Sequence, residues 1–203
     1  MLPIDMLSIV IQAGGESRRM GQDKSVVPFL GQPLIQRVIQ RLSPIAAEVL
    51  VTTNHPERLH FLGLRMESDL WPERSSLGGL YTAVHAARYP LAGVVACDMP
   101  FANPVLLEAE ADLALAGSFD VVIPQDAQGL EPLHAVYRRE TCLPAIRSAL
   151  EAGEKRMISW FPSVKVKVLS LEEVRVYDPK GIAFMNINTL DELHRAEAIS
   201  ETP

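Results

Sequence analysis

The sequence predicts an α/β fold with a doubly wound, mostly parallel sheet and helices on both faces. Short β-branched runs alternate with helical patterns over residues 1–125, which is the pattern of strands joined by crossover helices. The first run, residues 7–11, is nearly free of polar groups, as expected for a strand buried on both faces of a parallel sheet. A chain of 203 residues is long enough to bury one full core, so we expect a single domain.

Each expected element has its own local signal. Apolar residues at positions 34, 35, 38, 39 and 42 form the stripe of a helix that begins near Pro33. The strand at residues 49–53 leads into a turn at Asn54, and residues 64–66 form a short third strand. Further along we expect a helix at 80–87, a strand at 94–97, a helix at 104–115 and a strand at 121–123.

The pattern is less regular in residues 126–203. Strands are expected at 133–137 and 164–169, with a helix at 141–152 between them. This less regular C-terminal region is placed to cover a ligand site formed by the first half. The domain 1–203 therefore divides into a first part, 1–125, and a second part, 126–203.

Composition excludes several classes of protein. The net charge of −6 argues against non-specific nucleic-acid binding through a broad basic surface. The two cysteines, Cys97 and Cys142, have no spacing typical of a zinc site or a disulfide scaffold. No run of 18 apolar residues and no signal-peptide pattern is present, so we expect a soluble cytoplasmic protein that does not enter a membrane.

A glycine-rich basic loop follows the first strand. Gly14 and Gly15 allow the backbone to approach a ligand and to turn its N–H groups toward an anion. Arg18, Arg19 and Lys24 add positive charge suited to phosphate oxygens. The spacing fits neither a Walker A loop nor a dinucleotide fingerprint. The alternative is a basic surface turn without a ligand.

Acidic and amide residues follow other strands of the same sheet. Asp98 comes directly after the strand at 94–97, where a hard carboxylate is suited to Mg²⁺ with water and phosphate oxygens as its other ligands. The alternative is that Asp98 caps the helix that begins after Pro104. Asn54 and Asp69 also follow strands, but each taken alone is typical of a turn.

These motifs together resemble the MobA-like nucleotidyltransferase family. The run from Ala13 to Lys24 is similar to the family signature AGG-x-S-x-R-M-G-x-x-K. Four later segments recur in the family's order, namely Gly31-Gln32-Pro33-Leu34, Cys97-Asp98-Met99-Pro100, Gly153-Glu154-Lys155-Arg156 and Asn186-Ile187-Asn188-Thr189. The resemblance covers nearly the whole chain and implies a Rossmann-like nucleotidyltransferase fold. Its Asn-x-Asn-Thr motif favours the molybdopterin branch.

The resemblance implies transfer of GMP from GTP to the phosphate of molybdopterin, with release of pyrophosphate. Residues 1–125 would then bind the nucleotide and residues 126–203 the acceptor. The implied roles are nucleotide binding by Gln12, Ala13, Gly14, Gly15, Lys24, Asn54, Asp69 and Asp98; catalysis by Arg19, Lys24 and Asp98; Mg²⁺ binding by Asp98; and acceptor binding by Arg156, Asn186 and Asn188. The resemblance also implies transient contact with other proteins of molybdenum cofactor biosynthesis.

Two departures from the family pattern bear on the nucleotide. Gln12 stands where the family has leucine, and Ser75-Ser76-Leu77-Gly78-Gly79 replaces its usual Gly-Pro-Leu segment. Both segments lie near the base pocket in the family. A molybdopterin cytidylyltransferase that uses CTP is therefore one alternative, and a non-catalytic nucleotide-binding regulatory protein is another. His134 lies in the substrate-side region and is a candidate for contact with the pterin.

Overall fold

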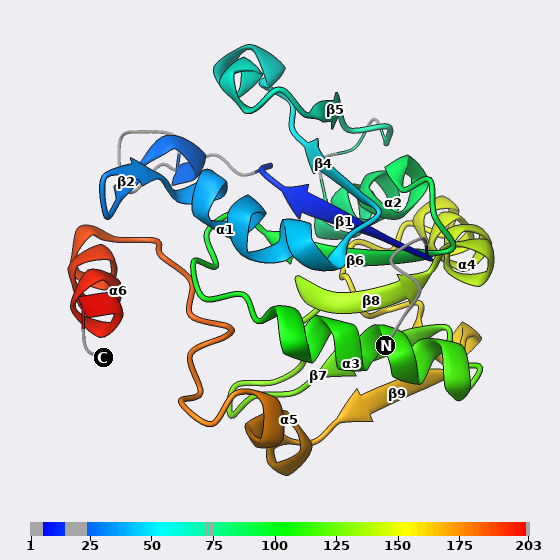
Figure 1. The fold of residues 1–203 in the computed structure, drawn as a ribbon. Helices are drawn as coiled ribbons and strands as arrows, with labels where there is room; N and C mark the ends of the chain where they lie inside the picture. Colours follow the sequence, from blue (N-terminus) through cyan, green and yellow to red (C-terminus); the bar gives the residue numbers. More distant parts are fainter. Residues whose placement is uncertain (1–5, 15–23, 72, 74, 202–203) are drawn as a thin grey trace.

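A seven-stranded sheet forms the centre of the molecule (Figure 1). The computed structural model describes residues 6–14, 24–71, 73 and 75–201. The strands lie in the order β5-β4-β1-β6-β8-β7-β9. Their bounds are β1 Leu7–Gln12, β4 Glu48–Thr52, β5 Arg65–Glu67, β6 Leu91–Ala96, β7 Val121–Pro124, β8 His134–Arg138 and β9 Val166–Leu169. The short strands β2 (Pro28–Phe29) and β3 (Gln32–Pro33) pair separately as an antiparallel hairpin.

The predicted fold class is confirmed. Strands β5, β4, β1 and β6 are parallel neighbours, and β7 pairs in parallel with β9. Only β8, among the described strands of this sheet, runs against its neighbours β6 and β7. The apolar pattern of β8 indicates burial on both faces but carries no information on direction, which is why the sequence alone does not reveal this reversal.

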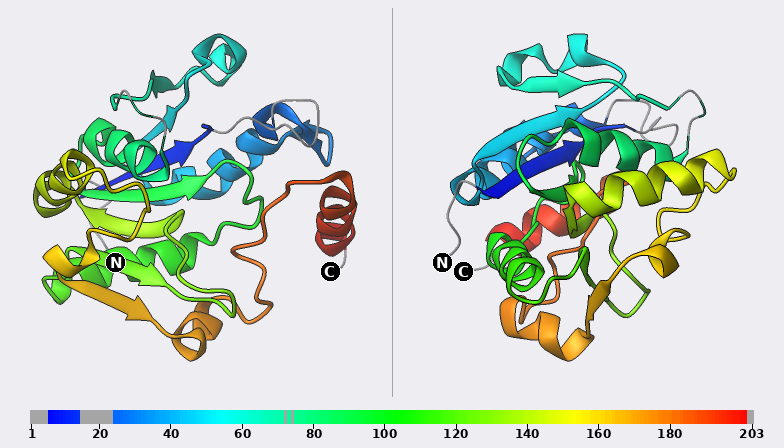
Figure 2. Two further views of the ribbon diagram at one scale, coloured as in Figure 1. Left: turned by 180° about the vertical axis from the view of Figure 1, so that it is seen from behind. Right: turned by 90° about the vertical axis from the view of Figure 1, so that its right-hand side faces the viewer.

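Helices cover both faces of the sheet, as the alternation of elements predicted (Figures 1 and 2). Helices α1 (Leu34–Leu42) and α3 (Pro104–Ala116) pack on the face that carries Ile9 and Ile11. Helices α2 (Ser76–Ala86) and α4 (Arg139–Glu151) pack on the opposite face, against Val10 and Leu50. The alternation of side chains along β1 therefore feeds two separate cores, one on each face of the sheet.

Helix starts differ from the sequence prediction where a polar cap sets the boundary. Helix α2 begins four residues earlier than expected because the Ser75 hydroxyl accepts a hydrogen bond from the Gly78 N–H (3.0 Å). Two helices were not predicted, α5 (Leu171–Tyr177) and α6 (Leu190–Glu201). Each begins with a Ser/Thr-x-x-Glu capping box, at Ser170 and Thr189 respectively.

The described residues include no helix with the length and apolar character needed to cross a membrane.

A buried ionisable pair lies between α3 and the start of β8. The side chains of Glu110 and His134 are both fully buried, with His134 Nδ1 3.4 Å from Glu110 Oε1. The Asn103 N–H donates to His134 Nε2 (3.0 Å), so the imidazole is neutral with its proton on Nδ1, facing Glu110. Burial raises the pKa of Glu110 well above its usual value and lowers the pKa of His134 to about 4.

This pair makes stability depend on pH in two opposite directions. The pKa of Glu110 is higher in the folded than in the unfolded chain. Its contribution to the free energy of unfolding is therefore complete below about pH 4.5 and is lost as the pH rises toward the folded pKa. The pKa of His134 is lower in the folded chain, so stability is lost as the pH falls from about 6.5 toward 4.

Replacing Glu110 by Gln should remove the loss of stability at rising pH. The amide keeps the size and shape of the side chain but cannot ionise. We expect Glu110→Gln to gain stability relative to the wild type between pH 5 and pH 8, by at most about 1.4 kcal/mol per pH unit. Urea unfolding at four pH values measures this, with Glu108→Gln on the exposed side of α3 as the control. Equal pH profiles for wild type and Glu110→Gln would contradict the assignment.

Candidate functional site

Backbone hydrogen bonds align the carboxyl ends of three neighbouring strands. The Ala13 N–H donates to the Thr52 carbonyl (2.8 Å), and the Cys97 N–H donates to the Gln12 carbonyl (3.1 Å). Strands β4, β1 and β6 therefore end level with one another. The residues that follow them share one edge of the sheet, which is where ligands bind in open α/β sheets.

Asn54 and Asp69 are brought together at this edge. Asn54 Nδ2 donates to Asp69 Oδ2 (2.6 Å), and the Asp69 N–H donates to Asn54 Oδ1 (3.0 Å). Neither residue is buried, so the reciprocal pair fixes two exposed loops after β4 and β5. The pair leaves exposed polar atoms of both side chains at the β4 side of the carboxyl edge.

Lys24, Asp98 and Asn188 form a second group, here called the Lys24 cluster. Lys24 begins the short 3₁₀ helix η2 (Lys24–Val26), and its Nζ lies 3.6 Å from Asp98 Oδ2. The same ammonium donates to Asn188 Oδ1. Their side chains are only partly buried, at 24% exposure for Lys24 and 16% for Asp98. The cluster thus joins the glycine-rich loop, the end of β6 and the C-terminal segment.

The C-terminal segment is held in place by its own backbone. The Ile187 N–H donates to the Asp98 carbonyl (3.0 Å). Glu192 Oε2 accepts from the N–H groups of Asn188 (2.7 Å) and Thr189 (2.9 Å), which closes the capping box of α6. Sequence reasoning missed Glu192, although the Thr189-x-x-Glu192 spacing was the signal that could have identified it.

The environment of Asp98 disfavours its ionised form unless a cation is near. Burial raises the pKa of Asp98, the positive charge of Lys24 opposes that shift, and Glu192 raises the pKa further. The alternative role of Asp98 as a helix cap is wrong, because the side chain of Asn103 accepts from the N–H groups of Val105 (2.9 Å) and Leu106 (3.2 Å). The carboxylate of Asp98 therefore faces Lys24 and does not cap α3.

The amide of Gln12 rests against the first turns of α2. A Cβ atom at Gly79 would lie 2.5 Å from Gln12 Nε2, so only glycine leaves room for the amide in this position. Sequence reasoning noted both residues as departures from the family pattern but not that they are neighbours. The two departures from the family pattern, Gln12 and the segment that contains Gly79, are therefore in contact at the end of β1.

The remaining predicted residues are less closely grouped. Arg156 is exposed, and its neighbour Lys155 accepts through its carbonyl from the Leu77 N–H (3.2 Å), which places this segment beside the start of α2. Asn186 precedes Asn188 by two residues, and its Nδ2 donates to the Phe184 carbonyl (3.2 Å). Ala13 is partly buried and Gly14 exposed at the end of β1, whereas Gly15 and Arg19 lie outside the described residues.

His134 lies in the protein interior. Its ring is fully buried, packs edge-on against Phe184 at 5.2 Å between centroids, and accepts from Asn103. The hypothesis of a contact with the pterin is therefore wrong. In the described part of the chain there is also no group of three or more His, Cys, Asp or Glu side chains that could hold a metal ion by itself.

One protein family matches most of the chain. The model of the MobA-like NTP transferase domain matches residues 9–166. The chain belongs to the MobA-like NTP transferase family. The match includes Gln12, Asn54, Asp69 and Asp98, and it ends at the first residue of β9.

Curated members of this family align over almost their whole length. A probable molybdenum cofactor guanylyltransferase of Pelotomaculum thermopropionicum is 37% identical over 95% of this chain and 92% of its own. The molybdenum cofactor guanylyltransferase of Desulfosudis oleivorans is 33% identical over 96% of both chains. The crystal structure of molybdopterin-guanine dinucleotide biosynthesis protein A from Archaeoglobus fulgidus superposes with a TM-score of 0.82, at 27% identity and with 97% and 100% of the two chains covered.

A methyl group at Gly79 should displace the Gln12 amide and weaken nucleotide binding. Alanine favours the helical conformation over glycine by up to about 1 kcal/mol, and this gain offsets the cost of moving the Gln12 side chain. The free energy of unfolding should therefore change little. We expect affinity for the nucleotide to fall several-fold, measured by titration calorimetry. In a Gln12→Ala background the same substitution should have no further effect, and an equal loss there would show that Gln12 is not the affected group.

Proposed function

We propose that this protein transfers GMP from GTP to the phosphate of molybdopterin, forming molybdopterin guanine dinucleotide and pyrophosphate. Its similarity to molybdenum cofactor guanylyltransferases supports this reaction. The observation that carries the proposal is the Lys24 cluster. A lysine from the glycine-rich loop and a carboxylate from the end of β6 meet an amide of the C-terminal segment at one edge of the sheet.

The reaction needs charge stabilisation more than proton transfer. The acceptor phosphate is already an anionic nucleophile, so no general base is required. Negative charge grows on the pyrophosphate as its bond to the α-phosphorus breaks, and two polyanions must approach each other. The Lys24 ammonium meets that charge directly. Asn188 hydrogen-bonds Lys24 and so orients the ammonium toward the same edge as Asp98.

Mg²⁺ fits the donors that this chain provides. Asp98 offers one partly buried hard carboxylate, and Mg²⁺ in such sites takes one or two carboxylates and completes its shell with water and phosphate oxygens. When bound, Mg²⁺ would neutralise charge on the triphosphate and on Asp98. The chain's own contribution is to hold the Asp98 loop through the Ile187 N–H.

The nucleoside and the acceptor would both bind at the carboxyl edge of the sheet, around the Lys24 cluster. The Asn54–Asp69 pair and the Gln12 amide provide polar groups for a base and ribose on the β4 side. Asn186, Asn188 and the exposed Arg156 are the proposed acceptor contacts. Transient contact with other proteins of molybdenum cofactor biosynthesis and a cytoplasmic location also belong to this proposal.

GTP should bind at least tenfold more tightly than CTP in the presence of Mg²⁺. A polar site that hydrogen-bonds one base leaves its own groups unpaired when a smaller base binds. Titration calorimetry with GTP, CTP and ATP measures the ratio. Tighter binding of CTP would assign the chain to cytidylyl transfer, and nucleotide binding without pyrophosphate release in the presence of molybdopterin would favour a regulatory role.

Replacing Asp98 by Asn should abolish transfer without unfolding the protein. The substitution keeps the size of the side chain, and α3 remains capped by Asn103. It removes the negative charge that a hard cation requires, so we expect Mg²⁺-dependent pyrophosphate release to fall at least about a hundredfold. Thermal melting should stay close to that of the wild type.

The matched control is Asp112→Asn, which removes one exposed carboxylate from α3. It should leave both turnover and melting unchanged. Retained turnover in Asp98→Asn would falsify the metal-ligand role of Asp98.

A further inference from the structure

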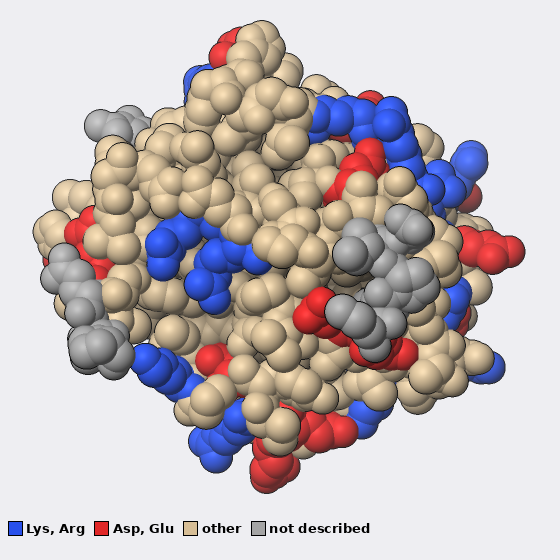
Figure 3. Space-filling model, in the orientation of Figure 1, with Lys and Arg blue, Asp and Glu red and all other residues tan. Residues whose placement is uncertain are grey.

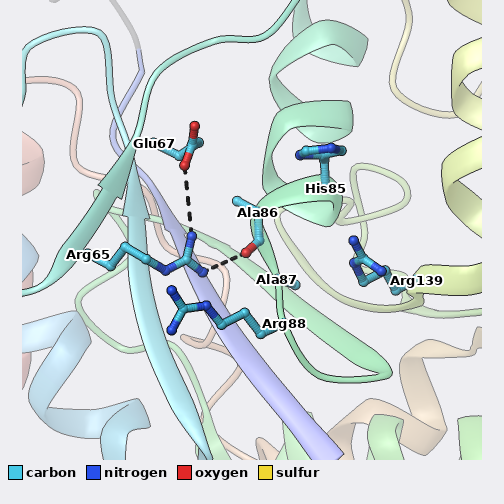
Figure 4. A pocket seen from close by; sticks show the side chains of 7 residues that line it. All are labelled: Arg65, Glu67, His85, Ala86, Ala87, Arg88 and Arg139. Atoms are coloured by element: carbon cyan, nitrogen blue, oxygen red, sulfur yellow. Dashed lines mark hydrogen bonds and ion pairs between the residues drawn. The ribbon is translucent and has the colours of Figure 1, made fainter.

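A polar pocket opens at the amino ends of the strands, at the opposite edge of the sheet from the Lys24 cluster (Figure 4). Its volume is about 360 Å³. Contacts of its residues with the starts of β4 and β1 fix this location, because Arg65 bonds Glu48 and the Arg88 N–H donates to Ser8 Oγ (3.2 Å). The lining residues are Arg65, Glu67, His85, Ala86, Ala87, Arg88 and Arg139.

Positive groups outnumber negative ones around this pocket. Arg65 is well compensated, since its Nη2 lies 2.8 Å from Glu48 Oε1 and its Nη1 3.8 Å from Glu67 Oε2. Arg88 Nε lies 3.6 Å from the same Glu48 oxygen, so two guanidinium groups share that carboxylate. Within the described residues, no carboxylate is in ion-pairing distance of Arg139. Lys and Arg side chains also gather on the surface over β5 and α2 (Figure 3).

Arg139 has a buried donor that the protein leaves unsatisfied. Its Nε is buried and, among the described residues, has no hydrogen-bond partner. A buried donor without a partner is unfavourable, and it leaves the charge of Arg139 without local compensation. Arg139 is also the first residue of α4, whose cap position, Arg138, provides no side-chain hydrogen bond to the helix start. The N-terminal end of this 13-residue helix adds partial positive charge near the pocket.

We propose that this pocket binds a compact phosphate-type anion, independently of the nucleotide site. Arginine forks match phosphate oxygens in geometry and charge. Arg65 and Arg88 lie side by side, with His85 and Arg139 beyond Ala86 and Ala87 (Figure 4). An anion between them would balance the positive charge of Arg139 and the shared charge of Arg88. The alanines give the pocket an apolar wall that suits the small organic part of a phosphate ester.

Binding of simple phosphates to single-residue variants tests this site. The probes are inorganic phosphate and glycerol 3-phosphate, titrated by calorimetry into the full chain at low ionic strength, without nucleotide. We expect Arg88→Gln and Arg139→Gln to weaken binding at least tenfold, and added salt to weaken it in the wild type. Arg88 is 70% exposed, so its variant keeps the test valid if Arg139→Gln does not fold.

Two further variants separate this site from other sources of binding. Arg147→Gln removes the same charge from the exposed side of α4 and should bind both probes as the wild type does. Lys24→Ala disables the proposed nucleotide site and should retain binding at this pocket, whether or not GMP transfer is confirmed. Glycerol 3-phosphate binding more tightly than inorganic phosphate would identify an ester as the ligand, and equal affinities a free anion. Binding that survives in both Arg88→Gln and Arg139→Gln, or no binding to the wild type, would overturn the proposal.

Discussion

The site depends on the parallel register of β4, β1 and β6. The Gln12 carbonyl accepts from Cys97 and the Thr52 carbonyl receives the Ala13 N–H, so the three strands end at one level. A slip of one residue would turn every side chain of a strand to the other face. Both faces of β1 are buried, in two separate cores, which makes such a slip unfavourable. The strand interior therefore determines where the polar residues after each strand can lie.

The C-terminal segment contributes the third member of the Lys24 cluster. Asn188 reaches Lys24 across 164 residues of sequence, and the contact is supported by the Ile187 N–H bond to Asp98. A third apolar cluster lies beneath this junction and joins the β2–β3 hairpin, the loop after β6 and α6 through Phe29, Phe101, Ile187 and Leu193. The Lys24 cluster is thus held by elements from both ends of the chain, which explains why a regular pattern in the first half does not suffice to build it.

Most of the fold was predictable because it is encoded in local patterns. The β-branched runs and the apolar stripe at residues 34–42 identified α1 and the strands of the seven-stranded sheet to within a few residues, but not the short β2–β3 hairpin. The direction of β8 was not predictable, because burial on both faces looks the same for either direction. Helix α6 was missed for a different reason, since only one narrow side of it is apolar and its capping box at Thr189 is a short signal.

The site was predictable in part for a related reason. Residues that directly follow strands could be placed at the carboxyl edge, and Asn54, Asp69 and Asp98 do lie there. Contacts that depend on packing between distant segments left no local signal. The fit of Gln12 against Gly79 and the pair formed by Glu110 and His134 are of this kind, because each requires two elements to be docked before the side chains meet.

The charges around Asp98 connect the ligand-free protein to the proposed reaction. Burial and Glu192 both disfavour the Asp98 carboxylate, and Lys24 is the cation that opposes them. A triphosphate that attracts the Lys24 ammonium would leave Asp98 with less compensation, unless a cation arrives with the nucleotide. In the proposed reaction, a nucleotide–Mg²⁺ complex would meet both needs at once, because Lys24 would hold its phosphates and Asp98 would hold its cation. Lys24 and Asp98 would then act together, and we expect the free nucleotide to be a poorer ligand than its magnesium complex.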